Sequence, residues 1–343
     1  MLAHTAELWP EFRNASIFIT GGTGFFGYWL LSSFAAANER FKLKARAVVL
    51  TRDAEAFRKR TPELASDSAI RFHPGDVRSF EFPAGGFTHV IHGATPASAT
   101  LNSSRPMEML DINVEGTKRV LEFARTKRIP KFLLCSSGAV YGRQPTDVDR
   151  VPEDFSGGPD CLDPYWAYGE GKRVAELLCA MYAREHRIQT KIARGWTFVG
   201  PHLPLDIHFA IGNFLRDTLE GKPIRIQGDG TSFRSYLYTA DLMIWLWTIL
   251  AKGRTARAYN VGSEHVVSIA ELARRTAAVV APGTPVEIAR EAIPGRPAER
   301  YVPSTERARL ELGLEERIGL DEAIRRTAEW HRALEADPLR QTT

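Results

Sequence analysis

Cysteine is scarce in this chain of 343 residues, which has only three, at Cys135, Cys161 and Cys179. No two of them have the C-x-x-C spacing of a redox motif or a zinc ligand pair, and their odd number speaks against a disulfide framework. Residues 1–10 also lack the basic and apolar regions of a secretory leader. We therefore expect reduced thiols and a cytoplasmic location.

Long apolar runs and clusters of one charge are missing as well. The densest apolar stretch, 242–251, is too short to span a bilayer. The 45 Lys and Arg residues exceed the 41 Asp and Glu residues by a net charge of +4, and they are spread along the chain. This mild excess suits an anionic small molecule and does not favour nucleic acid. We expect no membrane, nucleic-acid or metal partner.

The first part of the sequence alternates short apolar runs with amphipathic segments. Strands are expected over 16–20, 45–50, 70–73, 89–92, 131–136 and 190–194, with helices over 28–38, 107–127 and 165–186. Alternating strands and helices favour a parallel sheet covered on both faces. The fold class predicted is therefore α/β, a Rossmann-type doubly wound sheet.

The pattern changes after a Pro-rich break at 201–204. Helices are expected over 211–220, 241–251 and 320–334, with a short strand ending at Val261. We expect a dinucleotide-binding domain over 1–199 and a smaller mixed α/β substrate lobe over 200–343, with 237–262 returning to the first domain. Such a lobe would lie beside the carboxyl ends of the strands, where open α/β sheets bind ligands.

A glycine-rich turn follows the first strand directly and opens a helix. Gly21 would permit the tight turn, Gly24 would let the backbone approach a pyrophosphate, and Gly27 would permit close packing of the helix on the strand. The N–H groups at the start of the helix would then face the phosphates. In this context the turn predicts a dinucleotide cofactor.

The end of the second strand bears on which cofactor binds. An acidic residue there usually accepts from the ribose hydroxyl of NAD, but this strand ends in Leu50 and Thr51, and Arg52 follows. A guanidinium suits the 2′-phosphate of NADP, so we predict NADP, with NAD as the alternative because Asp53 could still reach the ribose. Asp76, after the third strand, either accepts from the adenine amine or forms an Asx-turn.

A second constellation suggests acid–base chemistry. Tyr168 and Lys172 are four residues apart in a predicted helix and would share one face. A nearby cation favours the phenolate, so we expect Lys172, together with the positive nicotinamide ring of the oxidised cofactor, to lower the pKa of Tyr168 from its usual value near 10. Ser137 closes a strand at the carboxyl edge, where it could hydrogen-bond a substrate oxygen. Neither the Tyr168/Lys172 spacing nor the segment with Ser137 is specific alone. Their occurrence together with the glycine-rich turn is specific.

These segments together resemble the extended short-chain dehydrogenase/reductases, in their nucleotide-sugar epimerase/dehydratase group. The resemblance also includes the motifs at 113–117, 136–142, 228–230 and 234–236 and covers nearly the whole chain. It implies that Ser137, Tyr168 and Lys172 are catalytic. It implies a cofactor site made of Gly21, Thr23, Gly24, Phe25, Phe26, Gly27, Arg52, Asp76, Val77, Ala94, Thr95, Asn113, Tyr168 and Lys172.

The same resemblance implies a nucleotide-diphosphate sugar as the substrate. Arg234 and Arg296 would hold its pyrophosphate, since two guanidiniums suit a doubly anionic diphosphate, although each could also be a surface ion pair. Ser137, Gly138 and Asn213 would complete the substrate contacts. Specificity positions are expected at Thr95, Trp166, Trp196, His208 and Asn213.

The residues that follow Ser137 separate the possible reactions. Related 4,6-dehydratases carry an Asp–Glu pair there, and UDP-glucuronate decarboxylases carry a Glu at the second position. Gly138 and Ala139 transfer no proton, which disfavours both reactions even though residues 168–179 closely resemble the decarboxylases. Two enzymes remain: a 4-keto reductase like CDP-abequose synthase and the dTDP-fucose-forming reductases, which Arg52 favours, and an NAD-retaining 4-epimerase.

Two further expectations concern other classes and assembly. A catalytically dead binding relative is disfavoured, because Ser137, Tyr168 and Lys172 are all present. Relatives commonly dimerise through a four-helix bundle, so we expect a homodimer built from the helices at 107–127 and 165–186.

Overall fold

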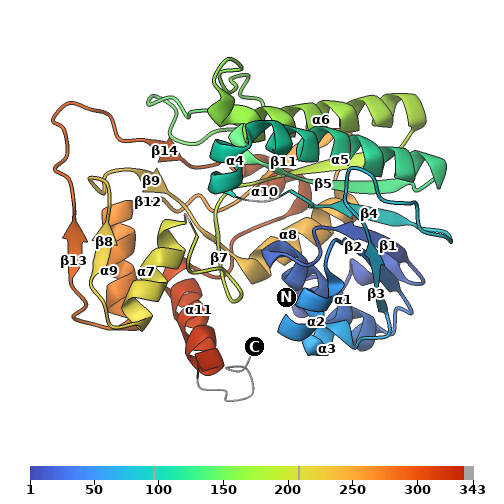
Figure 1. The fold of residues 1–343 in the computed structure, drawn as a ribbon, viewed down its shortest axis with the longest axis horizontal. Helices are drawn as coiled ribbons and strands as arrows, with labels where there is room; N and C mark the ends of the chain where they lie inside the picture. The colour runs from blue at the N-terminus through green and yellow to red at the C-terminus, as the bar shows by residue number, and fades with distance from the viewer. Residues whose placement is uncertain (96–97, 208, 336–343) are drawn as a thin grey trace.

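The computed structural model describes residues 1–95, 98–207 and 209–335 (Figure 1). Seven strands form its central sheet, in the order β11-β6-β5-β4-β1-β2-β3, and every neighbouring pair is parallel. Their bounds are β1 Ser16–Thr20, β2 Arg46–Thr51, β3 Ile70–Pro74, β4 His89–His92, β5 Lys131–Ser137, β6 Gln189–Gly195 and β11 Arg257–Val261. This doubly wound sheet confirms the predicted fold class.

Helices cover the two faces of the sheet and enclose separate cores. One face packs against α1 (Phe25–Phe41), α2 (Ala54–Arg60), α3 (Pro62–Ala65), α8 (Thr239–Lys252) and α10 (Glu306–Leu312). The other packs against α4 (Ala99–Ser104), α5 (Pro106–Thr126) and α6 (Ala167–His186). The alternation of side chains along each strand divides them between the cores: Ile17 and Ile19 face α1, whereas Phe18 faces α5.

Helix α8 accounts for the densest apolar stretch of the sequence. Its residues from Leu242 to Leu250 are all buried, including Trp245 and Trp247. The N-terminal residues add to this core, since Trp9 and Phe12, in the short 3-10 helix η2 (Trp9–Phe12), lie 5.1 and 5.2 Å from the Trp247 ring. Among the described residues, no helix combines the length and apolarity needed to cross a bilayer.

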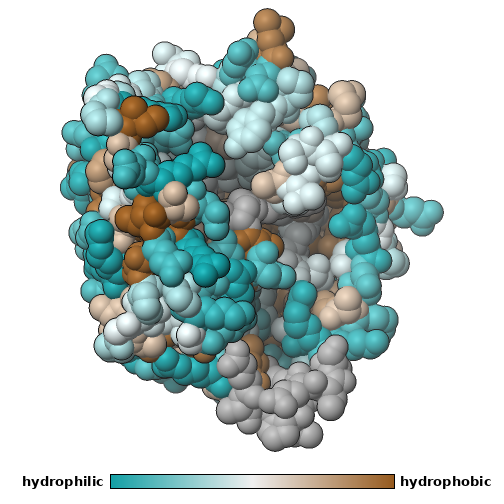
Figure 2. All heavy atoms as spheres, turned by 60° about the vertical axis from the view of Figure 1, so that its left-hand side comes forward, coloured by the Kyte–Doolittle hydropathy of each residue, from teal (hydrophilic) through white to brown (hydrophobic). Residues whose placement is uncertain are grey.

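A second group of elements lies beside the sheet, on the left of Figure 1. It consists of α7 (Ala210–Leu219), α9 (Ile269–Val280) and α11 (Leu320–Glu335), the paired strands β8 (Ile224–Ile226) and β13 (Val286–Ile288), and a ladder of β12 (Val267–Ser268), β9 (Phe233–Arg234) and β14 (Arg300–Tyr301). These elements, called the substrate lobe below, share a third apolar core. Figure 2 shows a groove running down this side of the molecule.

The chain passes between the sheet and the substrate lobe more than once. It leaves the sheet through β7 (Phe198–Val199), which pairs with β10 (Leu237–Tyr238) when the chain returns. Helix α8 and strand β11 then lie with the sheet, and β11 pairs with β6 at its edge. The carboxyl ends of the strands and the substrate lobe are therefore joined by several crossings of the chain.

Candidate functional site

The glycine-rich turn between β1 and α1 has the geometry of a phosphate cradle. Gly21 has φ +75°, and a Cβ atom there would lie 2.4 Å from the Gly93 carbonyl oxygen. A Cβ atom on Gly27 would lie 2.2 Å from the backbone of Gly22, so the helix packs directly on the turn. Gly24 is the exposed N-cap of α1, and nothing lies within 3.5 Å of where its Cβ would be.

This geometry fits a dinucleotide. Helix α1 begins at Phe25 rather than at the expected Tyr28, because Gly24 already caps it. Its first N–H groups therefore follow the open surface at Gly24, where the partial positive charge of a helix N-terminus favours a phosphate. Phe26 is held edge-on against Phe198, with ring centroids 5.0 Å apart, and Phe25 packs on the core of the substrate lobe.

The end of β2 brings several cations together. Arg52 is exposed, and it is close enough to Asp76 to help lower the pKa of that carboxyl. Arg60, at the end of α2, donates to the Thr23 carbonyl oxygen over 2.5 Å. Asp53 caps α2 by accepting from the Ala56 N–H at 2.9 Å, so its carboxylate is already engaged.

Asp76 is held by Arg78 in this structure. Its Oδ1 accepts from the Arg78 N–H at 2.9 Å, and the Arg78 guanidinium donates to both carboxylate oxygens at 2.8 and 2.9 Å. This bidentate pair lowers the pKa of Asp76 to about 2. The geometry is that of an Asx-turn, one of the two alternatives that the sequence leaves open. Val77, next in the chain, packs on Gly116 of α5.

The loop that follows β4 is hydrogen-bonded to the carboxyl end of β1 and to α5. The N–H groups of Gly93 and Ala94 both donate to Thr20 Oγ1 at 3.2 Å. Thr95 donates to Asn113 Oδ1 at 3.0 Å, and the Asn113 amide donates to the Met109 carbonyl. These contacts fix Ala94 and Thr95 between β1 and Asn113 of α5.

Ser137, Tyr168 and Lys172 come together at the carboxyl end of β5. Ser137 is its last residue, and the Ala139 N–H donates to Ser137 Oγ at 3.1 Å. Tyr168, in the first turn of α6, hydrogen-bonds the Ser137 side chain. Lys172, 4% exposed, donates to Thr95 Oγ1 at 3.0 Å and to the Cys135 carbonyl at 2.9 Å.

Lys172 alone does not lower the Tyr168 pKa in this structure, so that part of the prediction is wrong. Burial raises the Tyr168 pKa, and the hydrogen bond to Ser137 only partly opposes it. Lys172 Nζ lies 5.9 Å from the centre of the Tyr168 ring and is itself buried, which lowers its own pKa to about 8. Phenolate stabilisation must therefore come from Ser137 and from whatever charge a bound ligand brings.

Two aromatic residues complete this site, and one of them, Tyr301, was not predicted. A Cβ atom on Gly138 would lie 2.6 Å from Tyr301 Oη and 2.8 Å from the Trp196 indole. The Trp196 and Tyr301 rings pack together with centroids 4.4 Å apart. Tyr301 belongs to β14 of the substrate lobe, far from Ser137 in sequence, so only the tertiary fold reveals it.

The other predicted substrate residues are spread over the substrate lobe. Arg234 lies on β9 in register with Tyr301, and its charge acts on that phenol. Arg296 is exposed on the loop after β13, and its charge helps to lower the pKa of Asp229. Asn213, on α7, accepts from Arg216 at 3.3 Å.

Two of the proposed specificity positions remain to be placed. Trp166 is half-buried at the end of the 3-10 helix η4 (Pro164–Trp166), just before the catalytic helix. Asn102 of α4 fixes this junction, because its side chain accepts from the Tyr168 N–H at 3.1 Å and donates to the Tyr165 carbonyl at 2.6 Å. His208 lies outside the described residues.

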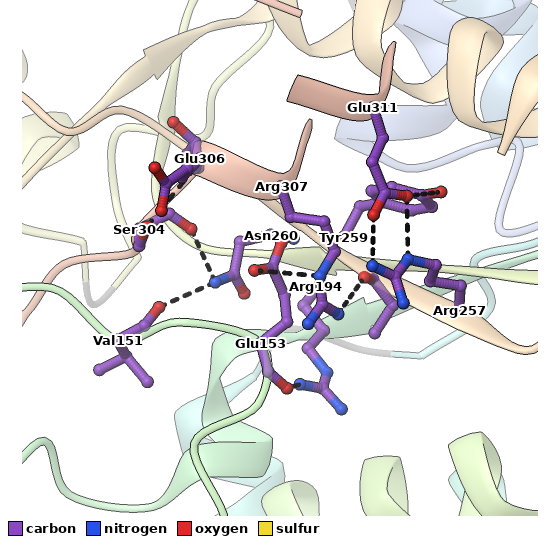
Figure 3. Close-up of polar contacts among 12 residues, drawn as sticks. Val151, Glu153, Arg194, Arg257, Tyr259, Asn260, Ser304, Glu306, Arg307 and Glu311 are labelled. Atoms are coloured by element: carbon purple, nitrogen blue, oxygen red, sulfur yellow. Dashed lines mark hydrogen bonds and ion pairs between the residues drawn. The ribbon is translucent and has the colours of Figure 1, made fainter. Parts of the chain in front are cut away.

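A buried polar network supports the site from behind (Figure 3). Asn260 of β11 donates to the Val151 and Ser304 carbonyls, both at 2.9 Å, and its N–H donates to Glu153 Oε1 at 2.8 Å. The Asn260 side-chain oxygen accepts from Tyr141 Oη at 2.9 Å and from Trp196 Nε1 at 3.2 Å. These contacts satisfy the whole amide, so the segments it joins are held in one arrangement.

A buried ion pair connects this network to β5, the strand that ends at Ser137. Arg194 of β6 and Glu176 of α6 approach to 2.6 Å with side chains only 15% and 11% exposed. Glu176 also accepts from Ser136 Oγ at 2.5 Å, next to Ser137. Arg194 reaches in the other direction, to Tyr141 Oη at 2.7 Å. The carboxyl end of β5 is thereby linked by hydrogen bonds and an ion pair to α6 and to the Asn260 network.

Comparisons with known proteins agree with this geometry. Residues 17–262 match the family model described as "NAD dependent epimerase/dehydratase family". UDP-glucuronic acid decarboxylase 3 of Arabidopsis thaliana is 29% identical over 312 residues, which are 91% of this chain and 87% of the relative. UDP-glucuronic acid decarboxylase 1 of Xenopus tropicalis is 27% identical over 319 residues, 92% and 72% of the two chains.

Solved structures share the fold at lower identity. The dTDP-glucose 4,6-dehydratase of Streptomyces venezuelae, with NAD and TYD bound, superposes with a TM-score of 0.80 and 22% identity over 94% of this chain and 99% of that one. The UDP-glucuronic acid 4-epimerase of Bacillus cereus, in complex with UDP-glucuronic acid and NAD, gives a TM-score of 0.78 and 22% identity over 93% and 99%.

Proposed function

This chain belongs to the NAD dependent epimerase/dehydratase family, and from that premise we propose that it is an NADPH-dependent reductase of a nucleotide-linked 4-keto-6-deoxy sugar. The family comprises enzymes that act on nucleotide sugars, and the chain carries the Ser137, Tyr168 and Lys172 set that hydride transfer at C4 requires. What distinguishes members of the family is the chemistry added around that set.

One observation carries the choice of reaction: no proton-transferring side chain follows Ser137. Gly138 and Ala139 occupy the positions where dehydratases and decarboxylases carry acidic groups, and the space at Gly138 is filled by the Tyr301 phenol and the Trp196 indole. Eliminating the C6 hydroxyl or a carboxylate calls for additional acid–base groups beside the sugar. A simple transfer of hydride and proton at C4 does not.

The proposed mechanism uses the residues in the arrangement described above. The glycine-rich turn would hold NADPH, which would supply the hydride that converts the C4 ketone to a secondary alcohol and would be released as NADP⁺. Tyr168 gives its proton to the C4 oxygen, and Ser137 donates a hydrogen bond to that oxygen as negative charge develops on it. Lys172, held by Thr95 and the Cys135 carbonyl 5.9 Å from the centre of the Tyr168 ring, would help to hold the cofactor beside the phenol.

Arginines at the adenosine end support NADP as the cofactor. Arg52 and Arg60 form no ion pair within 4.0 Å among the described residues, although Arg52 acts on Asp76 from a longer distance, whereas Asp53 caps a helix and Asp76 is paired with Arg78. Two guanidiniums suit a 2′-phosphate, and a bare ribose hydroxyl offers them no charge to bind. The cofactor would lie over the glycine-rich turn, with Phe25, Val77 and Asn113 among its flanking residues.

The substrate part of the proposal rests on the lobe beside the sheet. Arg234 and Arg296 would hold the pyrophosphate of a nucleotide-diphosphate sugar, with Asn213 near the nucleotide and Ser137 and Gly138 at the sugar. Arg234 is part of strand β9, whereas Arg296 is exposed on the loop after β13, so the two guanidiniums would reach the pyrophosphate from different segments.

The decisive experiment offers the purified protein a panel of nucleotide-linked 4-keto-6-deoxy sugars with NADPH or NADH. The proposal expects oxidation of NADPH that depends on the sugar, with a product reduced at C4 by mass spectrometry and NMR. Oxidation without any sugar, or no oxidation with any member of the panel, would contradict it. The matched control is Tyr168→Phe, which keeps the pocket and removes the proton donor.

A 4-epimerase is the second candidate, and the structural relatives solved with NAD favour it. An epimerase retains its cofactor and returns the hydride to the same carbon, whereas a reductase exchanges its cofactor at every turnover. Mass spectrometry of nucleotides carried through purification separates the two. Stoichiometric NAD would favour the epimerase, while a site that exchanges NADPH favours the reductase.

A further inference from the structure

Tyr301 reaches the catalytic strand from a different part of the chain. It lies on β14, whose neighbour β9 carries Arg234 in the matching register position. Its ring packs on Trp196, and its hydroxyl occupies the space that a side chain on residue 138 would need. The side chain is half-buried, and its hydroxyl lies against Gly138, close enough to Ser137 for the two groups to interact.

The residues that follow Tyr301 are held in place by hydrogen bonds to other segments of the chain. The Val302 N–H donates to Gln144 Oε1 at 2.9 Å, and the Val302 carbonyl accepts from the Val151 N–H at 3.0 Å. Ser304 is held in turn by Asn260, as Figure 3 shows. The position of the phenol therefore does not depend on its own hydroxyl, so removing the hydroxyl alone should leave the ring in place.

The hydrogen-bonding capacity of Ser137 then determines where its proton points. A serine hydroxyl has two acceptor sites and one hydrogen. The Ala139 N–H takes one acceptor site at 3.1 Å. Burial raises the pKa of Tyr301, so its hydroxyl stays protonated at neutral pH and can donate to the second site. The one hydrogen of Ser137 is left to face Tyr168 or the substrate oxygen.

We propose that Tyr301 is a positioning residue, which fills the second acceptor site of Ser137 and so commits Ser137 to donating its hydrogen bond to the reacting oxygen. The inference rests on the proposed hydride transfer at C4 and adds to it a residue outside the Ser137, Tyr168 and Lys172 set. It also gives a reason for glycine at position 138, because any larger residue would displace the Tyr301 hydroxyl from Ser137.

The first test is a double-mutant cycle with Tyr301→Phe and Ser137→Ala, measured by steady-state kinetics. Losing one neutral hydrogen bond should lower kcat of Tyr301→Phe by about three- to tenfold while KM stays within about twofold. In the Ser137→Ala background the same change should have no further effect, since the group that it positions is gone. Additive losses, or a loss confined to KM, would overturn the proposal.

Two controls separate a positioning role from packing. Tyr182→Phe removes a phenol hydroxyl on helix α6, where it donates to Glu122 outside the proposed site, and should leave kcat unchanged. Tyr301→Leu removes the ring as well as the hydroxyl. If the Tyr301 ring contributes only by packing, Tyr301→Phe should have the kcat of the parent and only Tyr301→Leu should be impaired. That outcome would contradict the proposal.

A substrate-free readout keeps this inference separate from the proposed reaction. Tyrosinate absorbance is titrated in the parent, Tyr301→Phe and Tyr168→Phe, the last of which identifies the step due to Tyr168. Ser137 lowers the Tyr168 pKa. In Tyr301→Phe, where Ser137 is no longer held by the phenol hydroxyl, the titration step of Tyr168 should therefore move to higher pH. If the Tyr168 titration step stays at the same pH in Tyr301→Phe, Tyr301 does not position Ser137, whatever reaction the protein catalyses. If the step moves but the protein has no reductase activity, the role of Tyr301 stands and the proposed reaction is wrong.

Discussion

At the carboxyl edge of the sheet, Lys172 is 4% exposed and makes both of its hydrogen bonds to groups that are fixed by neighbouring strands and helices. In the substrate lobe, Arg296 is exposed on a loop, and its described interaction is electrostatic, with Asp229. The groups around Ser137 are thus held in place by the fold itself. The exposed arginine is held far less firmly, and we expect a ligand to order it.

This contrast has an energetic meaning. A preorganised set of donors stabilises a transition state without reorganising during the reaction, so its groups should be sensitive to single substitutions. Charges on exposed segments are screened by water and contribute little until a ligand orders them. Substitutions at the sheet edge should therefore act on turnover or folding, and those in the lobe on ligand affinity.

Removing the proton donor should give the largest effect. Tyr168→Phe keeps the ring in the first turn of α6 and removes the hydroxyl, so turnover should fall by about 10²–10⁴-fold, the usual contribution of a positioned acid. Cofactor affinity should stay nearly that of the parent. Steady-state kinetics and a cofactor titration on the same samples check this, and activity within a few-fold of the parent would remove Tyr168 from the chemistry.

Breaking the buried ion pair should mainly affect folding. Arg194→Met leaves the Glu176 carboxylate buried without its partner, which should cost about 3–5 kcal/mol in the free energy of unfolding. The matched control is Arg225→Met in the substrate lobe, whose pair with Glu287 is 69% and 53% exposed and should be worth less than about 1 kcal/mol. Denaturant titration of both variants tests this, and equal losses would erase the contrast between the two regions.

Cofactor preference comes next in size. A well-formed contact to the 2′-phosphate contributes about 1.5–3 kcal/mol, so the parent should prefer NADPH over NADH by roughly ten- to a hundredfold. Arg52→Ala should remove most of that preference by weakening NADPH alone, and Arg52→Asp should reverse it. Arg58→Ala is the control, since Arg58 pairs with Glu55 on the exposed face of α2. Equal affinities in the parent, measured by calorimetry, would refute the assignment.

Assembly should respond least. Leu177 and Met181, one turn apart on α6, are 59% and 41% exposed, and Met107 at the start of α5 is 70% exposed. We predict that this face pairs with a second copy, so Leu177→Glu should weaken the dimer by at least about tenfold. Leu310→Glu, on α10 at the opposite face of the sheet, should not. Light scattering across a dilution series decides this, and a monomeric parent at micromolar concentration would end the idea.

Features encoded by local spacing were predictable from the sequence. The alternation of strands and helices indicated the sheet, and the turn from Gly21 to Gly27 needs only neighbouring residues to be recognised. The four-residue spacing of Tyr168 and Lys172 placed both on one helix. Helix α9 was missed, although Ser268 and Glu271 form the start of a capping box, in which Ser268 Oγ accepts from the Glu271 N–H.

Features that depend on distant segments were not predictable in the same way. Tyr301 joins Ser137 only because β14 is clamped against residues 149–153, and no local pattern marks it. Lys172 was expected to help lower the pKa of Tyr168, because the spacing shows the nearby cation but not the burial that raises this pKa. The cap that Asp53 forms on α2 through Oδ1 was not predicted either. Both features depend on surroundings that the linear sequence does not show.

The return of the chain to the sheet through β11 affects how the protein emerges from the ribosome. Strand β6 is complete once Gly195 has been synthesised, but β11, its parallel partner at the sheet edge, ends only at Val261. During that interval the apolar face of β6 lacks helix α8, which covers it in the finished fold, and exposed apolar surface of this kind favours aggregation. Binding of a chaperone to the nascent chain should therefore be greatest while the intervening residues are translated, and it should fall once α8 and β11 have packed against β6.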